Sequence, residues 1–113
     1  MAAVTYKVLG QVAPPTTTEQ DLYTVPGATQ GIASSITVAN RGTTLAYFRV
    51  AICPLGIATA NLHYLYYDVP IAGNDTFIAT IGLTLGATDK VKVYASGTGG
   101  GNLSFQLFGS ELT

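Results

Sequence analysis

The sequence has few of the residues that build reactive or charged sites. It contains no tryptophan, one cysteine, one histidine and one methionine, and only 10% of its 113 residues are charged, against about 25% in an average globular domain. A single cysteine excludes an internal disulfide framework, and one cysteine with one histidine excludes a Cys/His zinc cluster. Five basic and six acidic residues give a net charge of −1. That charge provides no electrostatic footprint for nucleic acid or for an anionic membrane, so we expect neither as a partner.

The low charge leaves much of the surface to Thr, Ser, Gly, Tyr and aliphatic side chains. Hydrophobic residues make up 48% of the chain, which is enough to form a core and argues against intrinsic disorder. Such a surface suits a protein whose exposed area is largely covered by neighbours in an assembly. The alternative is a weakly charged monomer that hydroxyl and amide groups keep in solution. We favour the first interpretation and predict a homo-oligomer.

No targeting or membrane-spanning segment is visible. No window approaches the ~20 apolar residues of a membrane helix. Tyr6 and Lys7 precede any apolar run long enough for a secretory signal. We therefore expect synthesis in a cytoplasm, with Cys53 as a reduced and packed side chain.

Apolar and polar residues alternate with a period of two between clusters of Gly, Pro, Asn, Asp and Thr, a pattern typical of β-strands. Such runs occupy residues 5–12, 21–25, 31–40, 44–53, 61–68, 76–85, 90–96 and 103 onward. The short connections favour antiparallel pairing. We predict an all-β fold, an antiparallel β-sandwich of about eight short strands, with jelly-roll and immunoglobulin-like wiring both open. Residues 1–20 are expected to form an N-terminal strand and extended arm, and residues 21–113 the β-sandwich domain.

The clearest alternation lies in residues 31–40 and 44–53. In the first run one face carries Ile32, Ser34, Ile36 and Val38, and in the second one face carries Ala46, Phe48, Val50 and Ile52. Between them lies a turn around Asn40 and Gly42, residue types that tolerate positive φ. We predict that the two runs pair as a β-hairpin.

The residues that catalysis needs form no recognisable constellation. His63 lies inside an aromatic run, and no serine stands on a Gly-x-Ser-x-Gly elbow. We therefore interpret His63 as packed at a strand surface with a hydrogen bond to a neighbour. The carboxylates lie mostly at strand ends or turns, where Asp forms local hydrogen bonds, and the Gly-rich run 97–102 lacks the Lys-Ser/Thr of a phosphate-binding loop. We predict that the protein is not an enzyme, with no catalytic, metal-binding or cofactor-binding residue and no cofactor.

The aromatic segment 61–68, Asn-Leu-His-Tyr-Leu-Tyr-Tyr-Asp, is the strongest candidate binding surface. A regular strand would place Leu62, Tyr64 and Tyr66 on one face and His63, Leu65 and Tyr67 on the other. A strand that is apolar on both faces is either central to a sandwich or covered by a partner, and Tyr suits interfaces because it combines contact area with a hydroxyl. The interface candidates here are His63, Tyr64, Leu65, Tyr66 and Tyr67. Two alternatives stay open: ordinary core and rim positions, or a platform on which a sugar stacks.

The N-terminal segment supplies the remaining interface candidates, which are Tyr6, Pro14 and Pro15. Residues 5–12 read as a strand, but the two prolines that follow donate no N–H group to a ladder. The segment is expected to reach away from the sandwich or along its edge. It would then add a strand to the sheet of a neighbouring subunit. Alternatively, residues 5–12 form an edge strand of the chain's own sheet.

Several runs resemble small virion structural proteins of tailed bacteriophages. The runs are Asp21-Leu22-Tyr23-Thr24-Val25-Pro26, Ser34-Ser35-Ile36-Thr37-Val38-Ala39-Asn40-Arg41-Gly42, the aromatic segment 61–68, Ile71-Ala72-Gly73-Asn74-Asp75-Thr76 and Val91-Lys92-Val93-Tyr94-Ala95-Ser96. The resemblance covers roughly residues 20–110. It implies a non-enzymatic subunit of the virion, either a capsid decoration or cement protein on the outer shell or a tail, baseplate or fibre-associated protein. It also implies the major capsid protein or tail proteins as partners. A trimer is favoured, because shell decoration often occupies three-fold positions.

Overall fold

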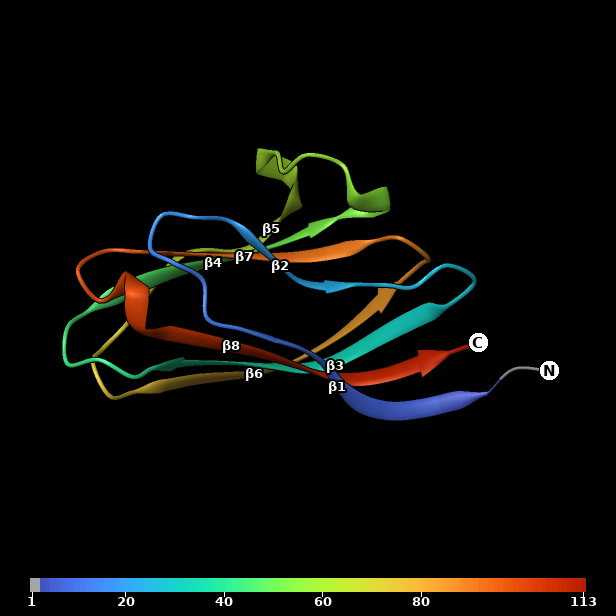
Figure 1. Cartoon of the computed structure of the whole chain (residues 1–113), viewed down its shortest axis with the longest axis horizontal. Coiled ribbons are helices and arrows are strands. Elements are labelled where there is room, and N and C mark those ends of the chain that lie inside the picture. Colours follow the sequence, from blue (N-terminus) through green and yellow to red (C-terminus); the bar gives the residue numbers. More distant parts are fainter. Residues whose placement is uncertain (1–2) are drawn as a thin grey trace.

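The computed structural model describes residues 3–113, which form two four-stranded antiparallel sheets packed face to face (Figure 1). Sheet A has the order β1-β8-β3-β6, and sheet B the order β2-β7-β4-β5. The strands of sheet A are β1 (Val4–Val12), β8 (Leu103–Leu112), β3 (Gln30–Asn40) and β6 (Thr76–Leu85). Those of sheet B are β2 (Gln20–Thr24), β7 (Lys90–Ser96), β4 (Ala46–Cys53) and β5 (Tyr64–Ile71). The predicted antiparallel sandwich of about eight strands is confirmed.

The wiring is that of a jelly roll, one of the two topologies that the sequence left open. Apart from β4 and β5, consecutive strands lie in opposite sheets, so the chain crosses the sandwich repeatedly. The predicted hairpin of residues 31–40 and 44–53 is therefore wrong, because β3 pairs with β6 and β8 while β4 pairs with β5 and β7. The turn itself forms: the Asn40 side chain donates to the Thr44 carbonyl at 2.8 Å and accepts from the Gly42 N–H at 3.0 Å. It leads the chain into the opposite sheet, where β4 also turns its apolar face to the core.

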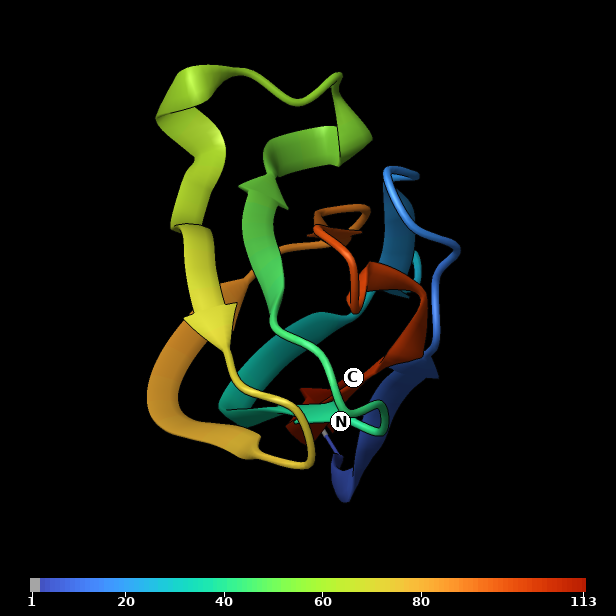
Figure 2. The same ribbon diagram turned by 90° about the vertical axis from the view of Figure 1, so that its left-hand side faces the viewer.

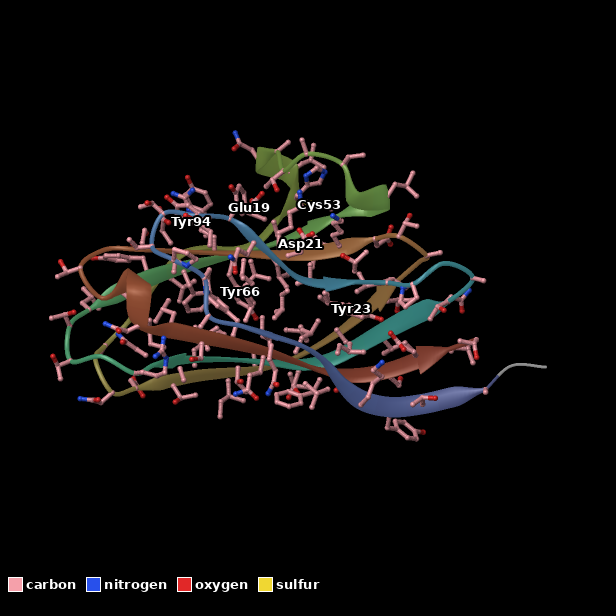
Figure 3. The ribbon with its side chains drawn as sticks, viewed as in Figure 1. Glu19, Asp21, Tyr23, Cys53, Tyr66 and Tyr94 are labelled. Atoms are coloured by element: carbon pink, nitrogen blue, oxygen red, sulfur yellow. The ribbon has the colours of Figure 1, made fainter. Side chains whose placement is uncertain are left out.

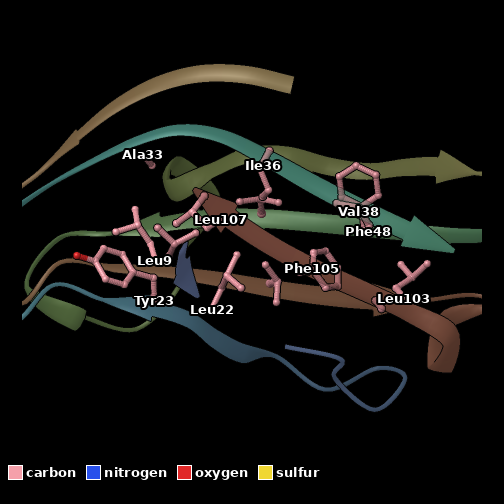
Figure 4. Close-up of a cluster of buried hydrophobic side chains, with 14 of the residues drawn as sticks. Leu9, Leu22, Tyr23, Ala33, Ile36, Val38, Phe48, Leu103, Phe105 and Leu107 are labelled. Atoms are coloured by element: carbon pink, nitrogen blue, oxygen red, sulfur yellow. The ribbon is translucent and has the colours of Figure 1, made fainter. Parts of the chain in front are cut away.

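The core lies between the two sheets and is built from their alternating inward residues (Figure 4). Phe48 from sheet B and Phe105 from sheet A are fully buried, with ring centroids 6.2 Å apart and an edge-to-face geometry. The ring centroid of Phe77 on β6 lies 5.1 Å from that of Phe48. Burying each such ring contributes about 1.5–3 kcal/mol, so these contacts hold sheet A against sheet B.

A β-bulge in β3 changes which residues of that strand face the core. Ser34 is an extra residue, since Ala33 pairs with Gly109 and Ser35 pairs with the adjacent Phe108. The extra residue shifts the period-two alternation. Ala33 is consequently buried and Ile32 is exposed, and Ser34 also lies at the surface. The prediction that Ile32 and Ser34 share one face with Ile36 and Val38 is wrong for this reason.

The N-terminal strand belongs to the chain's own sandwich. Strand β1 pairs with β8 along its whole length and forms one edge of sheet A. Residues 13–19 then cross to sheet B, where the Thr17 N–H donates to the Ala95 carbonyl at 2.7 Å. The structure thus has the second of the two arrangements, an edge strand, and the sandwich includes residues that we had assigned to a separate 1–20 segment.

Candidate interface surfaces

The aromatic segment begins as a helical turn and not as a strand. Residues 61–63 form a 3₁₀ helix, η2 (Asn61–His63), and β5 starts only at Tyr64. His63 is buried, and its Nδ1 accepts a 2.9 Å hydrogen bond from the Ala60 N–H. The predicted hydrogen bond to a neighbour is therefore present, whereas the predicted position in a strand is wrong. His63 is not available to a partner, which removes it from the interface candidates.

Two bulges in β5 change the predicted faces of the tyrosines. Leu65 is extra between Tyr64 and Tyr66, which face the adjacent Ala51 and Val50 of β4. A second bulge follows at Asp68, whose φ is +50°. Tyr66 consequently packs inward, with its ring 5.3 Å from that of Phe77, as Figure 3 also shows. The prediction that Tyr64 and Tyr66 share a face is wrong, because one extra residue between them inverts the alternation.

Tyr64 and Tyr67 instead meet on the outer face of sheet B, around Arg49 of β4. Their ring centroids are 4.8 Å apart. The Arg49 guanidinium carbon lies 4.2 Å from the Tyr67 ring centroid and 4.6 Å from that of Tyr94 on β7. We call Arg49, Tyr64, Tyr67, Asp68 and Tyr94 the arginine–tyrosine cluster. Sequence reasoning missed Arg49 and Tyr94, which lie on strands other than that of the aromatic segment.

The arginine is held in a fixed orientation by Asp68. Its Nε donates to Oδ1 at 2.7 Å and a terminal nitrogen donates to Oδ2 at 3.3 Å. These hydrogen bonds raise the pKa of Arg49 further above its already high value, so the group is always charged. A guanidinium stacked between tyrosine rings and paired with a carboxylate forms a surface that is both aromatic and polar. Leu65 is exposed beside it.

The candidates near the N-terminus have different environments. Tyr6 on β1 is 84% exposed and faces outward from sheet A. Pro14 is fully buried in the chain's own core, whereas Pro15 is exposed. Of the three, only Tyr6 and Pro15 can contact a partner. Pro14 was misassigned because its inability to donate a hydrogen bond says nothing about how its ring packs.

The outer face of sheet A carries no charged side chain. Among the residues of its four strands only Lys7 and Glu111 are charged. Both are on the inner side, where Lys7 Nζ lies 3.1 Å from Glu111 Oε1. The outer face presents the exposed apolar residues Val4, Tyr6, Val8, Ile32 and Ile78, with hydroxyl and amide side chains such as Thr37 and Gln106 between them. Sequence reasoning missed this face, although the lack of charge in these runs could have indicated it.

A second apolar feature is the loop between β4 and β5, which projects from the sandwich (Figure 2). It contains η1 (Pro54–Gly56) and η2, and its side chains Leu55, Ile57 and Leu62 are exposed. Its base is fixed at Cys53, whose Sγ lies 3.4 Å from Thr59 Oγ1 and 3.9 Å from His63 Nδ1. Cys53 is a free and buried thiol, as predicted. Because the thiol is fully enclosed, this Cys–His pair cannot meet a substrate.

The surface hollows contain no group of reacting side chains. Three of them have volumes of about 390, 340 and 380 Å³, and their linings include no His, Cys, Asp or Glu. Within residues 3–113 no three His, Cys, Asp or Glu side chains lie close enough together to hold a metal ion. No helix in the same range is long and apolar enough to cross a membrane.

Comparisons with known proteins identify the fold. No family model matches the sequence, and no curated protein does. Solved structures do match. A chain of infectious bursal disease virus, Gx strain, matches with a TM-score of 0.58 and 11% sequence identity, and the match covers 99% of this chain. A chain of the VP2 subviral particle of the same virus matches with a TM-score of 0.57 and 13% identity, and the match covers 98% of this chain. A chain of the T13 particle of this virus matches with 0.55 and 12% over 99%. The protein spans about a third of the length of these chains, 30–32%. At such low identity the likeness establishes the fold, a jelly roll of the kind that these viral particles contain.

Proposed function

We propose that the protein is a non-enzymatic structural subunit of a virion, made in the host cytoplasm and assembled into the particle. Its specific role is that of a capsid decoration or cement protein of a tailed bacteriophage, bound to the outer shell as an oligomer, with a trimer favoured. Its partners are other copies of itself and the major capsid protein. The observation that carries this proposal is the charge-free outer face of a jelly roll whose fold matches chains of viral particles.

The chemistry of the surface supports contact in preference to turnover. Catalysis needs a nucleophile or base within hydrogen-bond reach of a substrate position. The one histidine is buried with its Nδ1 occupied, and the hollows hold no paired carboxylates. A broad neutral sheet face, by contrast, is a large area that water solvates poorly and that a neighbour can cover.

The location in the particle is tested on purified virions that contain this chain. Heads and tails are separated and analysed by mass spectrometry, and the intact particle is imaged by cryo-electron microscopy. We expect the chain in the head fraction, with density on the outside of the shell at three-fold positions. Its presence in tails alone would support the tail, baseplate or fibre alternative, and its absence from the particle would refute the proposal.

Binding of a carbohydrate is a second candidate function, favoured by the arginine–tyrosine cluster. Jelly rolls serve in both viral capsids and lectins, so the fold alone does not choose. Tyr67 is more than half exposed, and a sugar ring stacked on it could hydrogen-bond to the Asp68 carboxylate. Tyr66, by contrast, packs against Phe48 and Phe77 and cannot serve as a platform.

A glycan array tests this second function. The variants are Tyr67→Ala, in the cluster, and Tyr6→Ala, which removes an exposed tyrosine from the opposite sheet. Sugar-specific, saturable binding that is lost in the first variant and retained in the second would establish a carbohydrate site. The structural proposal alone expects no saturable binding to any glycan.

A further inference from the structure

We propose that the outer face of sheet A is the surface through which two copies of this chain bind each other. The inference deepens the proposed function, because it rests on self-association and names the contact surface. A face that meets its own copy makes a two-fold contact, so the inference predicts a dimer at this face and not the trimer favoured above. The occupant is a second copy of the same chain, and the contact centres on Tyr6, Ile32 and Ile78.

The distribution of charge selects a second copy as the occupant. In a two-fold contact between identical chains the same residues recur on both sides, so a charge near the symmetry axis meets its own copy. Like charges placed together across an interface oppose binding. The outer face of sheet A avoids this cost, because the two charged residues of its strands, Lys7 and Glu111, are turned inward and paired with each other.

The outer face of sheet B has the opposite character. It carries three ion pairs, formed by Arg49 with Asp68, Lys90 with Asp21 and Lys92 with Glu19, at 2.7, 2.8 and 3.8 Å. The three acidic side chains are each more than one-third exposed, which is typical of a face in contact with water. Of the two broad faces, the neutral one is therefore the face that gains from being covered.

The outer face of sheet A also has a hollow and an exposed side chain that could fit together across a contact between two copies. A hollow of about 380 Å³ lies between β1, β3 and β8. Its lining includes Tyr6, Ile32 and Phe108, and also Lys7, whose amine is paired with Glu111. Tyr6 stands almost fully exposed at its border, so the ring of one copy can enter the hollow of the other. Tyrosine anchors of this kind contribute a large share of the binding free energy at interfaces.

The dimensions of the face are adequate. The molecule measures 48 × 26 × 19 Å. Figure 1 looks along the shortest axis and shows the two sheets one above the other, so each sheet face spans the 48 Å and 19 Å directions. A face of that size is comparable to the ~800 Å² per partner that a standard interface buries.

The experiment introduces one charge at a time and measures the oligomeric state. The face variants are Tyr6→Lys and Ile78→Lys, at positions 84% and 70% exposed. Leu62→Lys and Leu55→Lys are matched controls on the β4–β5 loop, at 84% and 73% exposed. Because all four side chains are largely in solvent in the single chain, the fold should tolerate each change, and circular dichroism confirms this. Sedimentation equilibrium then gives the dissociation constant of each purified full-length chain.

We expect the unchanged chain to be oligomeric at micromolar concentration. Each face variant should raise the dissociation constant at least about tenfold, and the loop controls should leave it unchanged. A chain that is monomeric up to several hundred micromolar refutes the inference, as do face variants that associate normally. If the monomer binds shells through Tyr6 and Ile78, the partner is the shell protein and not a second copy. That result overturns the inference and leaves the virion role intact, because presence in the particle is measured separately.

Discussion

The Tyr23 hydroxyl of β2 donates a 2.6 Å hydrogen bond to Oε2 of Glu111 on β8, and so joins sheet B to sheet A at one end of the sandwich. The other oxygen of Glu111 accepts from Lys7 at 3.1 Å. The hydrogen bond from Tyr23, with help from Lys7, lowers the pKa of Glu111. Burial, together with the adjacent carboxylate, raises the pKa of Tyr23.

This contact should make stability depend on pH at the acidic end. A carboxyl whose pKa is lowered in the folded state stabilises the fold above its unfolded value of 4.5, and this stabilisation disappears as the pH falls below that value. Tyr23→Phe removes a hydrogen bond to a charged group, so we expect a loss of about 1.5–3 kcal/mol at pH 7. The difference from the unchanged chain should shrink at pH 3. Urea unfolding at both pH values measures it, and an equal difference at both would contradict the argument.

Arg49→Ala should destabilise the protein more than loss of an ordinary surface ion pair. Arg49 combines two hydrogen bonds to Asp68 with stacking between Tyr67 and Tyr94. We expect a loss of about 1–2 kcal/mol. The control is Lys90→Ala, which breaks the exposed pair with Asp21 and should cost no more than about 1 kcal/mol. Thermal unfolding of the two variants compares them, and equal losses would show that the stacking contributes nothing.

Gly10→Ala should be poorly tolerated. A β-carbon at Gly10 would collide with the Leu22 carbonyl oxygen, because β1 passes directly over the backbone of β2 there. We expect a loss of about 1–3 kcal/mol through forced backbone movement. Gly27→Ala is the matched control, since a β-carbon at Gly27 meets nothing within 4 Å. That change should be neutral or gain up to about 1 kcal/mol. Denaturant unfolding of both variants measures the change in the free energy of unfolding. Equal changes would show that the close approach of β1 to β2 does not restrict residue 10.

His63→Ala should loosen the β4–β5 loop without unfolding the sandwich. His63 holds the loop through its bond from the Ala60 N–H and its contact with Cys53. Because Cys53 is fully buried, a thiol reagent should label it slowly in the unchanged chain. We expect labelling at least about tenfold faster in the variant. Similar labelling rates would mean that the loop is held by other contacts.

The predictable part of this fold is the part governed by period-two alternation. Strand β4 behaves as expected, with Phe48 and Val50 buried and Tyr47 exposed, since no extra residue interrupts it there. Strands β3 and β5 do not follow the predicted alternation, because Ser34 and Leu65 are each an extra residue with no counterpart in the paired strand. Nothing in the local sequence marks such a bulge, which depends on how the neighbouring strands are staggered. Pairing between distant strands, such as β1 with β8, is likewise outside the reach of a local pattern.

The candidate site was predicted only in part, because the bulge in β5 also changes which of its side chains face outward. Tyr67 and Leu65 lie at the surface as interface candidates should, whereas His63 and Tyr66 are turned inward. Arg49 and Tyr94 join Tyr67 only because β4 lies between β5 and β7. The sequence shows which residues are aromatic, but only the strand order shows which of them meet.

The position of β8 between β1 and β3 also determines when the neutral face can exist. During synthesis β1 and β3 emerge from the ribosome long before the residues from Leu103 onward, and neither can pair with β8 until then. Such long-range pairing is slow relative to local structure. The face that we assign to contacts between copies is therefore assembled last. Until β8 is in place, β1 and β3 lie apart, and the face cannot bind a second copy.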